Sequence, residues 1–272
     1  MTRLVTLMLA GTLLAAPLPG RAGACAAEAA PKDEPLDPAA LTAKVNALFK
    51  GKVVKFDAKT LALELLYEFK NEKEAEDFTL SEWAFAGKKG SLKVADGGCR
   101  LLKSNQVALV PGRFATVSAE VDFTLLSEGD QAAPCLTVCS DGAGSFYEIV
   151  GLYVKEAYLQ RCLGGGFLPL GKSEPSPFAK ERRGSMSIRF EKGRLTATVG
   201  KSAFEAEDAS LAAGQVGLRA YETDVEFRNL RISGVLERAW VDRLMGRAPP
   251  AEAPKPPPAP EPKPRPEEEE VF

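Results

Sequence analysis

Apolar and polar residues alternate along most of the chain between residues 61 and 234. In the clearest stretch, residues 114–126, one face of an extended chain would carry only apolar side chains: Val117, Ala119, Val121, Phe123 and Leu125. The same period of two recurs in residues 61–69, 133–139, 146–155, 157–163, 186–190 and 195–199. This period is typical of strands with one buried face, and roughly a dozen strands at close spacing predict an all-β sandwich or barrel. No long helical pattern separates them, which argues against a parallel α/β sheet.

The last two strands of the series are predicted within residues 214–234, where they would form a closing hairpin. A strict period of two would point Asn229 inward and Leu230 outward. Because Leu230 is the apolar residue, the phase must slip after Phe227, and we expect a β-bulge near Arg228 and Asn229. The segment therefore predicts an antiparallel pair of strands with one irregularity.

Helical spacing of apolar residues occurs at the two ends of this region. Asp37 and Pro38 suit the N-cap and the first position of a helix. Its apolar stripe consists of Leu41, Val45, Leu48 and Phe49. A second short helix is predicted over residues 235–246, ending at Gly246. We expect both helices to dock on the strands; binding of a partner by the first helix is the alternative.

The first 24 residues have the pattern of a secretory signal peptide, with Arg3, a short apolar run and small residues before Cys25. The run is too short for a comfortable membrane span, so no transmembrane span is predicted. Cleavage after Ala24 would leave Cys25 as the first residue. Two alternatives follow: acylation of Cys25, as in a lipoprotein, or plain cleavage. Both predict an exported protein, periplasmic or extracellular.

These patterns divide the chain into five parts. They are residues 1–24, a signal peptide; 25–60, a linker and docking helix; 61–234, the β-sandwich domain; 235–246, a C-terminal helix; and 247–272, a Pro/Glu-rich tail. Ten of the 20 prolines lie in the last 24 residues, among Ala, Lys and Glu. Such a composition cannot bury a core, so we expect the tail to be disordered. Recognition of a partner by the tail is the alternative.

The charge balance is close to neutral, with 35 Lys and Arg against 37 Asp and Glu. Nucleic acid is therefore not an expected partner. The chain has no histidine, which removes the commonest general base and the commonest zinc ligand. Any chemistry must then rest on carboxylates, Tyr, Lys, Arg or Cys.

Export also affects the interpretation of four cysteines, Cys99, Cys135, Cys139 and Cys162. An oxidising compartment permits two disulfides among them, with more than one connectivity. Cys135 and Cys139 would share one face of a strand about 13 Å apart, too far to pair with each other. Buried free thiols are the alternative. A metal site has less support, because histidine and a Cys-x-x-Cys spacing are both lacking.

Three segments carry a resemblance to a known superfamily: residues 65–69, 187–199 and 214–232. They read Leu-Leu-Tyr-Glu-Phe, Ser-Ile-Arg-Phe-Glu-Lys-Gly-Arg-Leu-Thr-Ala-Thr-Val, and Gly-Gln-Val-Gly-Leu leading to Val-Glu-Phe-Arg-Asn-Leu-Arg-Ile. Together they resemble the concanavalin-A-like lectin/glucanase (laminin-G-like) superfamily, and within it the secreted bacterial 3-keto-disaccharide hydrolase domain family. With the helices above, the expected fold is an all-β, two-sheet antiparallel jelly-roll sandwich with one short flanking helix at each end. The superfamily holds sugar-binding modules, glycoside-cleaving enzymes and proteins of unknown role, so fold alone does not give activity.

The resemblance suggests one pair of catalytic candidates, Glu120 and Asp122. Glucanases of the superfamily use paired acidic residues on one strand, where both can flank a bound sugar. The enzyme pattern has a further Glu where this sequence has Leu125, which weakens this interpretation. Solvent-facing positions on a half-buried strand explain the pair more simply, and we favour that alternative.

A carbohydrate-binding surface is predicted around Tyr147, Tyr153 and Tyr158, with Glu148 beside them. Exposed tyrosine rings offer an apolar platform with a hydroxyl that can hydrogen-bond a sugar. The alternative is that these rings pack in the core. No cofactor is predicted; Asp141, in a glycine-rich turn, is a weak calcium candidate, because a calcium site needs about six oxygens.

Three functions remain open on the sequence. The favoured one is an exported, non-catalytic β-sandwich that binds a carbohydrate or a cell-envelope partner. The second, a glycoside hydrolase of the 3-keto-disaccharide hydrolase type, follows from the resemblance alone. The third is a structural envelope protein. None of the three fixes an oligomeric state.

Overall fold

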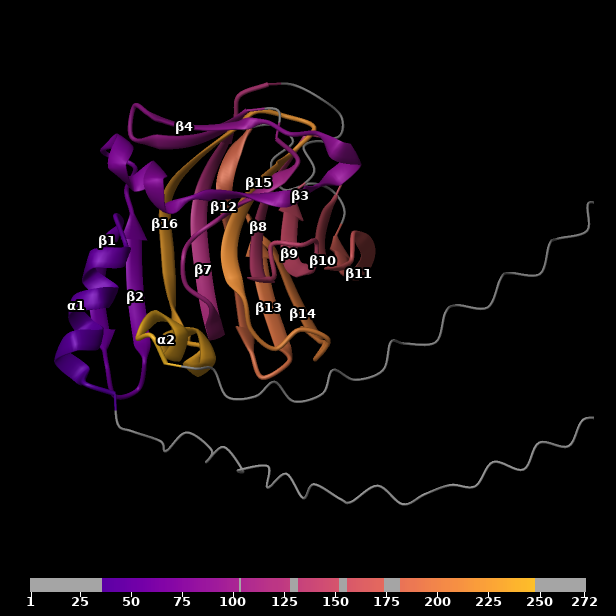
Figure 1. Ribbon diagram of the computed structural model, residues 1–272. Helices are drawn as coiled ribbons and strands as arrows, with labels where there is room; N and C mark the ends of the chain where they lie inside the picture. The colour runs from indigo at the N-terminus through magenta and orange to yellow at the C-terminus, as the bar shows by residue number, and fades with distance from the viewer. Residues whose placement is uncertain (1–35, 103, 128–131, 152–155, 174–181, 248–272) are drawn as a thin grey trace, which may run out of the picture. The chain divides into compact units, whose positions relative to one another are not determined.

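The computed structural model describes residues 36–102, 104–127, 132–151, 156–173 and 182–247. Within these residues the chain forms two β-sheets that pack face to face, and the strands pair antiparallel throughout (Figure 1). The predicted all-β, two-sheet jelly-roll sandwich with a short helix at each end is confirmed. The signal peptide, Cys25 and the Pro/Glu-rich tail lie outside the described residues.

The nine-stranded sheet has a main path of seven strands. In spatial order these are β1 (Lys52–Asp57), β2 (Ala62–Tyr67), β16 (Val225–Leu236), β7 (Phe114–Leu125), β12 (Arg183–Glu191), β13 (Arg194–Val199) and β14 (Ser202–Glu207). Two more strands lie off this path. β5 (Gly98–Leu102) pairs with β16, and β4 (Ser91–Ala95) pairs with β5.

The seven-stranded sheet carries the candidate site described below. In spatial order its strands are β11 (Gly166–Ser173), β10 (Ala157–Leu163), β9 (Phe146–Gly151), β8 (Ala133–Ser140), β15 (Gln215–Tyr221), β6 (Gln106–Leu109) and β3 (Thr79–Ala84). Between β3 and β4 lies a single 3-10 turn, η2 (Phe85–Gly87). Another 3-10 helix, η1 (Glu72–Asp77), lies between β2 and β3.

The core fills the space between the two sheets. The predicted inward face of β7 is buried along its length, at Val117, Ala119, Val121, Phe123 and Leu125. The seven-stranded sheet adds Leu136, Val138, Tyr147, Ile149, Leu159 and Leu218 to the same apolar cluster. Full burial of each large apolar side chain contributes about 1.5–3 kcal/mol. The period of two along β7 thus fixes which of its faces turns inward.

The first predicted helix is confirmed as α1 (Pro38–Leu48). The Asp37 carboxylate accepts hydrogen bonds from the backbone nitrogens of the first turn, at 2.9 and 3.3 Å, as an N-cap does. Leu41 and Val45 are fully buried in the core cluster, so this helix docks on the sandwich.

The second helix, α2 (Arg238–Leu244), is shorter than predicted because β16 continues to Leu236. Val241 is buried. Lys44 of α1 donates from Nζ to the carbonyl oxygen of Leu244 at 2.8 Å, which ties the two helices together. Neither described helix has the length and hydropathy needed to cross a membrane.

The predicted bulge is confirmed, but the hairpin that contains it is not. Asn229 has a φ of 53°, and the register between β16 and β7 shifts beside it. However, β15 and β16 do not pair: β15 lies in the seven-stranded sheet and β16 in the nine-stranded sheet. Residues 222–224 therefore carry the chain from one sheet to the other.

Two strands were not predicted. β1 lies in the region predicted as linker and helix, and β11 follows the glycine-rich turn after β10. Their exposure explains the omission, since β1 and β11 are edge strands without a regular alternation of buried residues.

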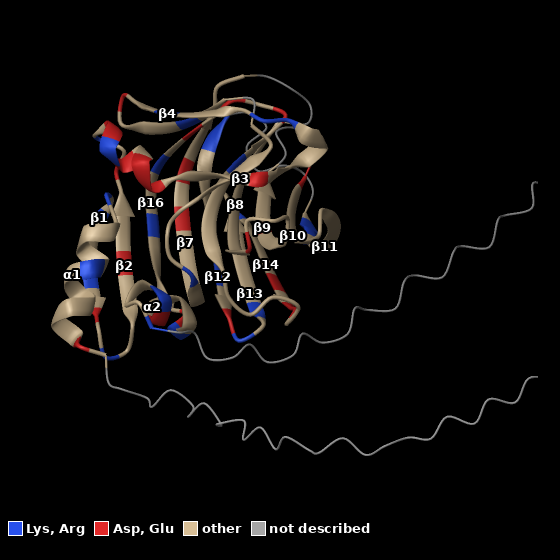
Figure 2. Cartoon of the chain, viewed as in Figure 1, with Lys and Arg blue, Asp and Glu red and all other residues tan. Residues whose placement is uncertain are grey.

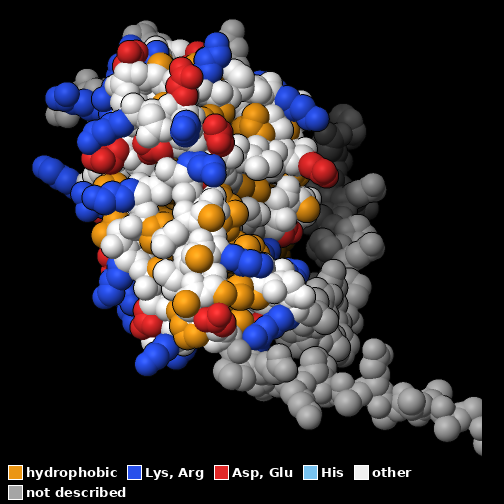
Figure 3. All heavy atoms as spheres, turned by 60° about the vertical axis from the view of Figure 1, so that its left-hand side comes forward, with side chains coloured by type: hydrophobic (Ala, Val, Ile, Leu, Met, Phe, Trp, Pro, Cys, Tyr) orange, Lys and Arg blue, Asp and Glu red, His pale blue; other side chains and the backbone are white. Residues whose placement is uncertain are grey.

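On the face that carries α1 and β1, charged side chains of both signs are interspersed with small apolar areas (Figure 3).

Candidate functional site

Both faces of the seven-stranded sheet are buried over its middle. Every residue of β8 and β9 is buried, although only one face of a strand can contact the core between the sheets. The outer face is covered in part by a second apolar cluster, in which Trp83 and Phe167 pack around Phe146. A pocket remains open next to this cluster.

An ion pair between Arg219 and Glu148 forms the bottom of this pocket. Arg219 of β15 is 2% exposed and Glu148 of β9 is 0% exposed. The guanidinium donates from Nη2 to Oε1 at 2.7 Å and from Nε to Oε2 at 3.1 Å, a bidentate geometry. Gln160 of β10 donates from Nε2 to the same Oε1 at 2.6 Å. The buried carboxylate is therefore compensated on both oxygens.

The remaining nitrogen of Arg219 is unsatisfied. Nη1 is buried and finds no hydrogen-bond acceptor within the described part of the chain. Burial opposes the charge of Arg219, but anionic neighbours, Glu148 among them, outweigh that cost and raise its pKa, so the guanidinium stays protonated. A buried donor without an acceptor costs about 1–3 kcal/mol. A ligand oxygen at this point would recover that free energy.

Aromatic rings stand on both sides of the guanidinium. Its central carbon lies 5.8 Å from the ring centre of Phe167 and 5.6 Å from that of Tyr221, within cation–π range. Phe85 contacts both rings, with centroid distances of 5.6 Å to Phe167 and 5.5 Å to Tyr221. The rings therefore hold one another and the guanidinium in place.

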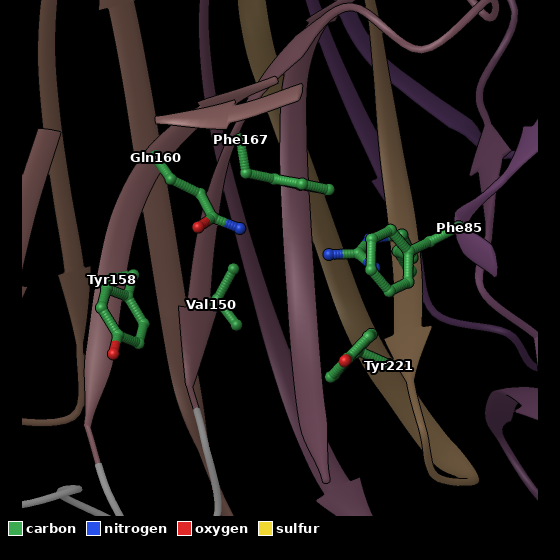
Figure 4. Close-up of a pocket in the computed structure, with 7 residues that line it drawn as sticks. Phe85, Val150, Tyr158, Gln160, Phe167 and Tyr221 are labelled. Atoms are coloured by element: carbon green, nitrogen blue, oxygen red, sulfur yellow. The ribbon is translucent and has the colours of Figure 1, made fainter. Parts of the chain in front are cut away.

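The pocket has a volume of about 180 Å³. It is lined by Phe85, Val150, Tyr158, Gln160, Phe167, Arg219 and Tyr221. Tyr158 stands on one side and Phe85 and Tyr221 on the other, with Val150 and Gln160 between them (Figure 4). The pocket thus has aromatic walls and a polar floor.

The register of the strands explains how these residues meet. Gln160 pairs directly with Glu148, and Tyr158 pairs with Val150, between β10 and β9. Side chains two residues apart on a strand share a face, so both pairs point outward together. Arg219 lies two strands away, on β15, and its long side chain reaches across β8 to Glu148.

This arrangement can bind a small polar ligand with an apolar face. Aromatic walls stack on such a face, and the Arg219 donor and the Gln160 amide fix its orientation. Among the described residues of the lining, Arg219 is the one that carries a charge, and Glu148 neutralises it. Glycoside hydrolysis requires a pair of carboxylates on either side of a ligand, and the described part of this lining has no such pair.

Of the predicted sugar-binding residues, Tyr158 and Glu148 lie at this pocket. Tyr158 lines it, and Glu148 lies under its floor. Tyr147, by contrast, provides no exposed ring: its alternate position on β9 points it into the core, where it is fully buried and its hydroxyl donates to Asp208 at 2.8 Å. Tyr153 lies outside the described residues.

The two catalytic candidates lie on the other sheet. Glu120 is exposed on β7, opposite Arg231 of β16 in the register. The Asp122 carboxylate accepts a hydrogen bond from Nδ2 of Asn229 at 2.9 Å. Acidic residues on β7 thus lie beside basic residues on β16 (Figure 2). Neither Glu120 nor Asp122 lines the pocket described above.

The Asp141 side chain is used within its own turn. Its Oδ1 accepts from the backbone nitrogens of Ala143 at 2.7 Å and Ser145 at 2.9 Å. Among the described residues, no three Cys, Asp or Glu side chains gather as a metal site would require. The calcium site therefore gains no support from the structure.

The four predicted disulfide candidates, Cys99, Cys135, Cys139 and Cys162, are buried free thiols. Burial raises the pKa of Cys99 and Cys139 to about 12 and of Cys162 to about 11. Cys135 and Cys139 do not share a face, contrary to expectation. Cys139 has a φ of 56° at a register shift in β8, which turns it into the core while Cys135 lies in an outer cluster.

Most of the pocket was missed from the sequence. These residues come from three separate parts of the chain: Phe85 from η2, Gln160 and Phe167 from the neighbouring strands β10 and β11, and Arg219 and Tyr221 from β15. The sequence signal that could have indicated the site was Arg219, a charged residue among the small and apolar residues of β15. The pairing of strands, which brings the rings to it, has no local signature.

Comparison with known proteins supports the fold. No protein-family model and no curated protein matches the sequence. Among solved structures, the carbohydrate binding module CBM66 from Bacillus subtilis is similar with a TM-score of 0.50 and 16% identity, over 57% of this chain and 94% of that one. A galectin-like protein of unknown function from the same organism gives 0.49, with 12% identity over 64% of this chain and 96% of that one.

The Bacillus licheniformis β-glucanase is also similar, with a TM-score of 0.47 and 8% identity over 63% of this chain and 97% of that one. At such identities the likeness concerns the fold alone. The chain therefore shares the antiparallel jelly-roll sandwich fold with the carbohydrate binding module CBM66.

Proposed function

We propose that this protein binds a carbohydrate in the pocket on the outer face of the seven-stranded sheet. The observation that carries the proposal is the buried, unpartnered Nη1 of Arg219, which lies between the rings of Phe167 and Tyr221. A sugar ring presents an apolar face to aromatic side chains and hydroxyl oxygens to a donor. Both requirements meet at one point in this pocket.

The size of the pocket limits the ligand that it can enclose. Its volume of about 180 Å³ is below the ~300–1,000 Å³ typical of pockets for drug-sized ligands. One sugar ring fits such a space better than a long stretch of polymer does. The similar module from Bacillus subtilis is named as carbohydrate-binding, which agrees with the proposal by analogy of fold.

A glycan array, probed with the full chain with and without calcium, tests the proposal. We expect binding to a defined set of glycans. Phe167→Ala and Tyr221→Ala should each lower the affinity about tenfold or more, because each removes a stacking surface. Glu120→Gln, on the other sheet, is the matched control and should leave binding unchanged. A folded wild-type chain that binds no glycan would contradict the proposal.

Hydrolysis of 3-keto disaccharides has less support as a function. The lining contains no pair of carboxylates within the part of the chain that the structure describes, and the buried Glu148 is held by Arg219 and Gln160. Incubation of the full chain with a 3-keto disaccharide tests this alternative, and release of monosaccharide would favour it over binding alone. If the protein has a purely structural role, the open pocket has no ligand, and the glycan array should show no binding.

We further propose that the protein is exported, to the periplasm or the outside of the cell, on the basis of the signal-peptide pattern in residues 1–24. Cell fractionation of the host, with Cys25→Ser as a variant, tests this proposal. A lipid-anchored protein would leave the membrane fraction when Cys25 is replaced, whereas plain cleavage would make the variant behave as the wild type. Retention of the unprocessed chain inside the cell would contradict export.

A further inference from the structure

A second hollow adjoins the pocket at one end of β15. It has a volume of about 380 Å³ and is lined by Lys88, Asn105, Ser127, Glu222, Thr223 and Asp224. Tyr221 lines the first pocket, and the next residue, Glu222, lines the second. Phe85 of the first pocket is three residues before Lys88 of the second. The two hollows therefore share a wall made of η2 and the end of β15.

One buried side chain fixes this shared wall. Asn105 is 1% exposed, and its Oδ1 accepts from the backbone nitrogen of Glu222 at 3.2 Å. Its Nδ2 donates to the carbonyl oxygen of Phe85 at 3.4 Å, and its backbone bonds to Phe85 and Lys88. The aromatic wall of the first pocket and the polar wall of the second are thus held in one fixed arrangement.

The chemistry of the second hollow differs from that of the first. The residues of its lining that the structure describes are all polar, and none of them has an aromatic ring. Ser127 and Thr223 share a hydrogen bond of 2.8 Å, and the backbone nitrogen of Asp224 donates to Oγ of Ser127 at 3.0 Å. Such a surface suits the hydroxyl-bearing edge of a sugar rather than its apolar face.

An exposed ion pair lies at the mouth of the second hollow. Lys88 donates from Nζ to Oε1 of Glu222 at 2.6 Å, and the two side chains are 52% and 31% exposed. A pair at this exposure contributes little to stability, so Lys88 can turn to a ligand at small cost. Oε1 of Glu222 also accepts from Nδ2 of Asn105 at 3.4 Å, which holds this carboxylate at the hollow. Lys88 would donate to one hydroxyl and Glu222 would accept from another.

We propose that the second hollow is a second sugar subsite, and that the ligand is an uncharged glycan of at least two residues. The inference rests on the proposed function and extends it. The first residue stacks in the aromatic pocket, and the next hydrogen-bonds in the polar hollow. Glu148 neutralises Arg219. The described lining of the second hollow has two carboxylates, Glu222 and Asp224, against the one cation of Lys88, so an acidic sugar would meet more negative than positive charge there.

Isothermal titration calorimetry with the full chain tests this inference. The ligands are neutral glucose, xylose and galactose saccharides of one to four residues. We expect the disaccharide of the bound series to bind about fivefold tighter than its monosaccharide, the equivalent of one good hydrogen bond. Lys88→Ala and Glu222→Gln should reduce this ratio toward one. Lys89→Ala, an exposed neighbour outside the lining, is the matched control and should keep the ratio of the wild type.

Each other outcome has a distinct meaning. Equal affinity for the monosaccharide and its oligomers, or a ratio unchanged in both variants, overturns the second subsite but leaves the proposed function standing. Tighter binding of glucuronic or galacturonic acid oligomers than of neutral ones overturns the assignment of an uncharged ligand. Binding of none of the probes to the folded wild type refutes the proposed function, and this inference with it.

Discussion

Removal of Glu148 gives the sharpest test of how the pocket floor is held. In Glu148→Ala the guanidinium of Arg219, 2% exposed, would lose both of its carboxylate hydrogen bonds, and Gln160 would lose its acceptor. An unpaired buried charge of this kind costs about 3–5 kcal/mol. With a denaturant slope of about 2.5 kcal/mol per molar urea, the unfolding midpoint should fall by roughly 1–2 M.

A double variant separates the lost pair from the lost packing. When Arg219→Met is added to Glu148→Leu, no charge remains in the floor, and replacement of a buried ion pair by apolar residues is often close to neutral. We expect the double variant to be more stable than the single variant Glu148→Leu, with a coupling of about 2 kcal/mol in the mutant cycle that Arg219→Met alone completes.

Urea unfolding at neutral pH, followed by circular dichroism, measures both quantities. Glu120→Ala, an exposed carboxylate on β7, is the matched control and should change the free energy of unfolding by no more than about 0.5 kcal/mol. A cost below about 1 kcal/mol for Glu148→Ala, or strictly additive effects in the cycle, would refute the description of the floor as a desolvated ion pair.

Three further predictions concern the sandwich. Gly234→Ala should cost about 1–3 kcal/mol in urea unfolding, because its Cβ would lie 2.2 Å from the carbonyl oxygen of Thr116 on the neighbouring strand. Burial raises the pKa of Glu226, but hydrogen bonds from two arginines outweigh it and lower the pKa below 4.5. The stability that this carboxylate contributes should therefore be lost as the pH falls below that value. In Glu226→Gln the loss of stability at low pH should be smaller. Tyr147→Phe should cost about 1 kcal/mol, measured in the same way, because it removes the hydroxyl bonded to Asp208.

Each of these has a result that would contradict it. For Gly234, the matched control is Gly166→Ala, whose Cβ would meet only an atom at 3.5 Å; equal costs at both positions would contradict the steric argument. A pH profile of the Glu226→Gln midpoint parallel to that of the wild type would show that this carboxylate is not linked to acid stability. An unchanged midpoint in Tyr147→Phe would mean that the hydroxyl bond is replaced by water without loss.

The sequence predicted those features that depend on a few neighbouring residues. The inward face of β7 follows from alternation, the start of α1 from the Asp37 N-cap, and the bulge at Asn229 from a slip in phase. In each case the cause is local, since side-chain direction along a strand and capping of a helix are set within a few residues.

The site was predicted only in part, for the same reason. Tyr158 and Glu148 were recognised as candidate binding residues. Tyr147 was placed with them, although it directly precedes Glu148 on β9 and therefore faces the core. A short apolar run buried on both faces gives no alternation from which to choose the inner face. Arg219 was passed over because its ion-pair partner Glu148 lies 71 residues away, and Phe167 because the rings that it contacts come from other strands and from η2.

The amino-acid sequence by itself thus determined that this chain is a two-layer β-structure with helices at its ends, because the period of its apolar residues admits little else. Only the tertiary structure decided that β15 and β16 belong to different sheets, and that rings from η2 and β11 cover the outer face of one of them. The physical reason is that alternation dictates which side chains need burial, whereas long-range strand pairing decides what buries them and leaves the pocket open.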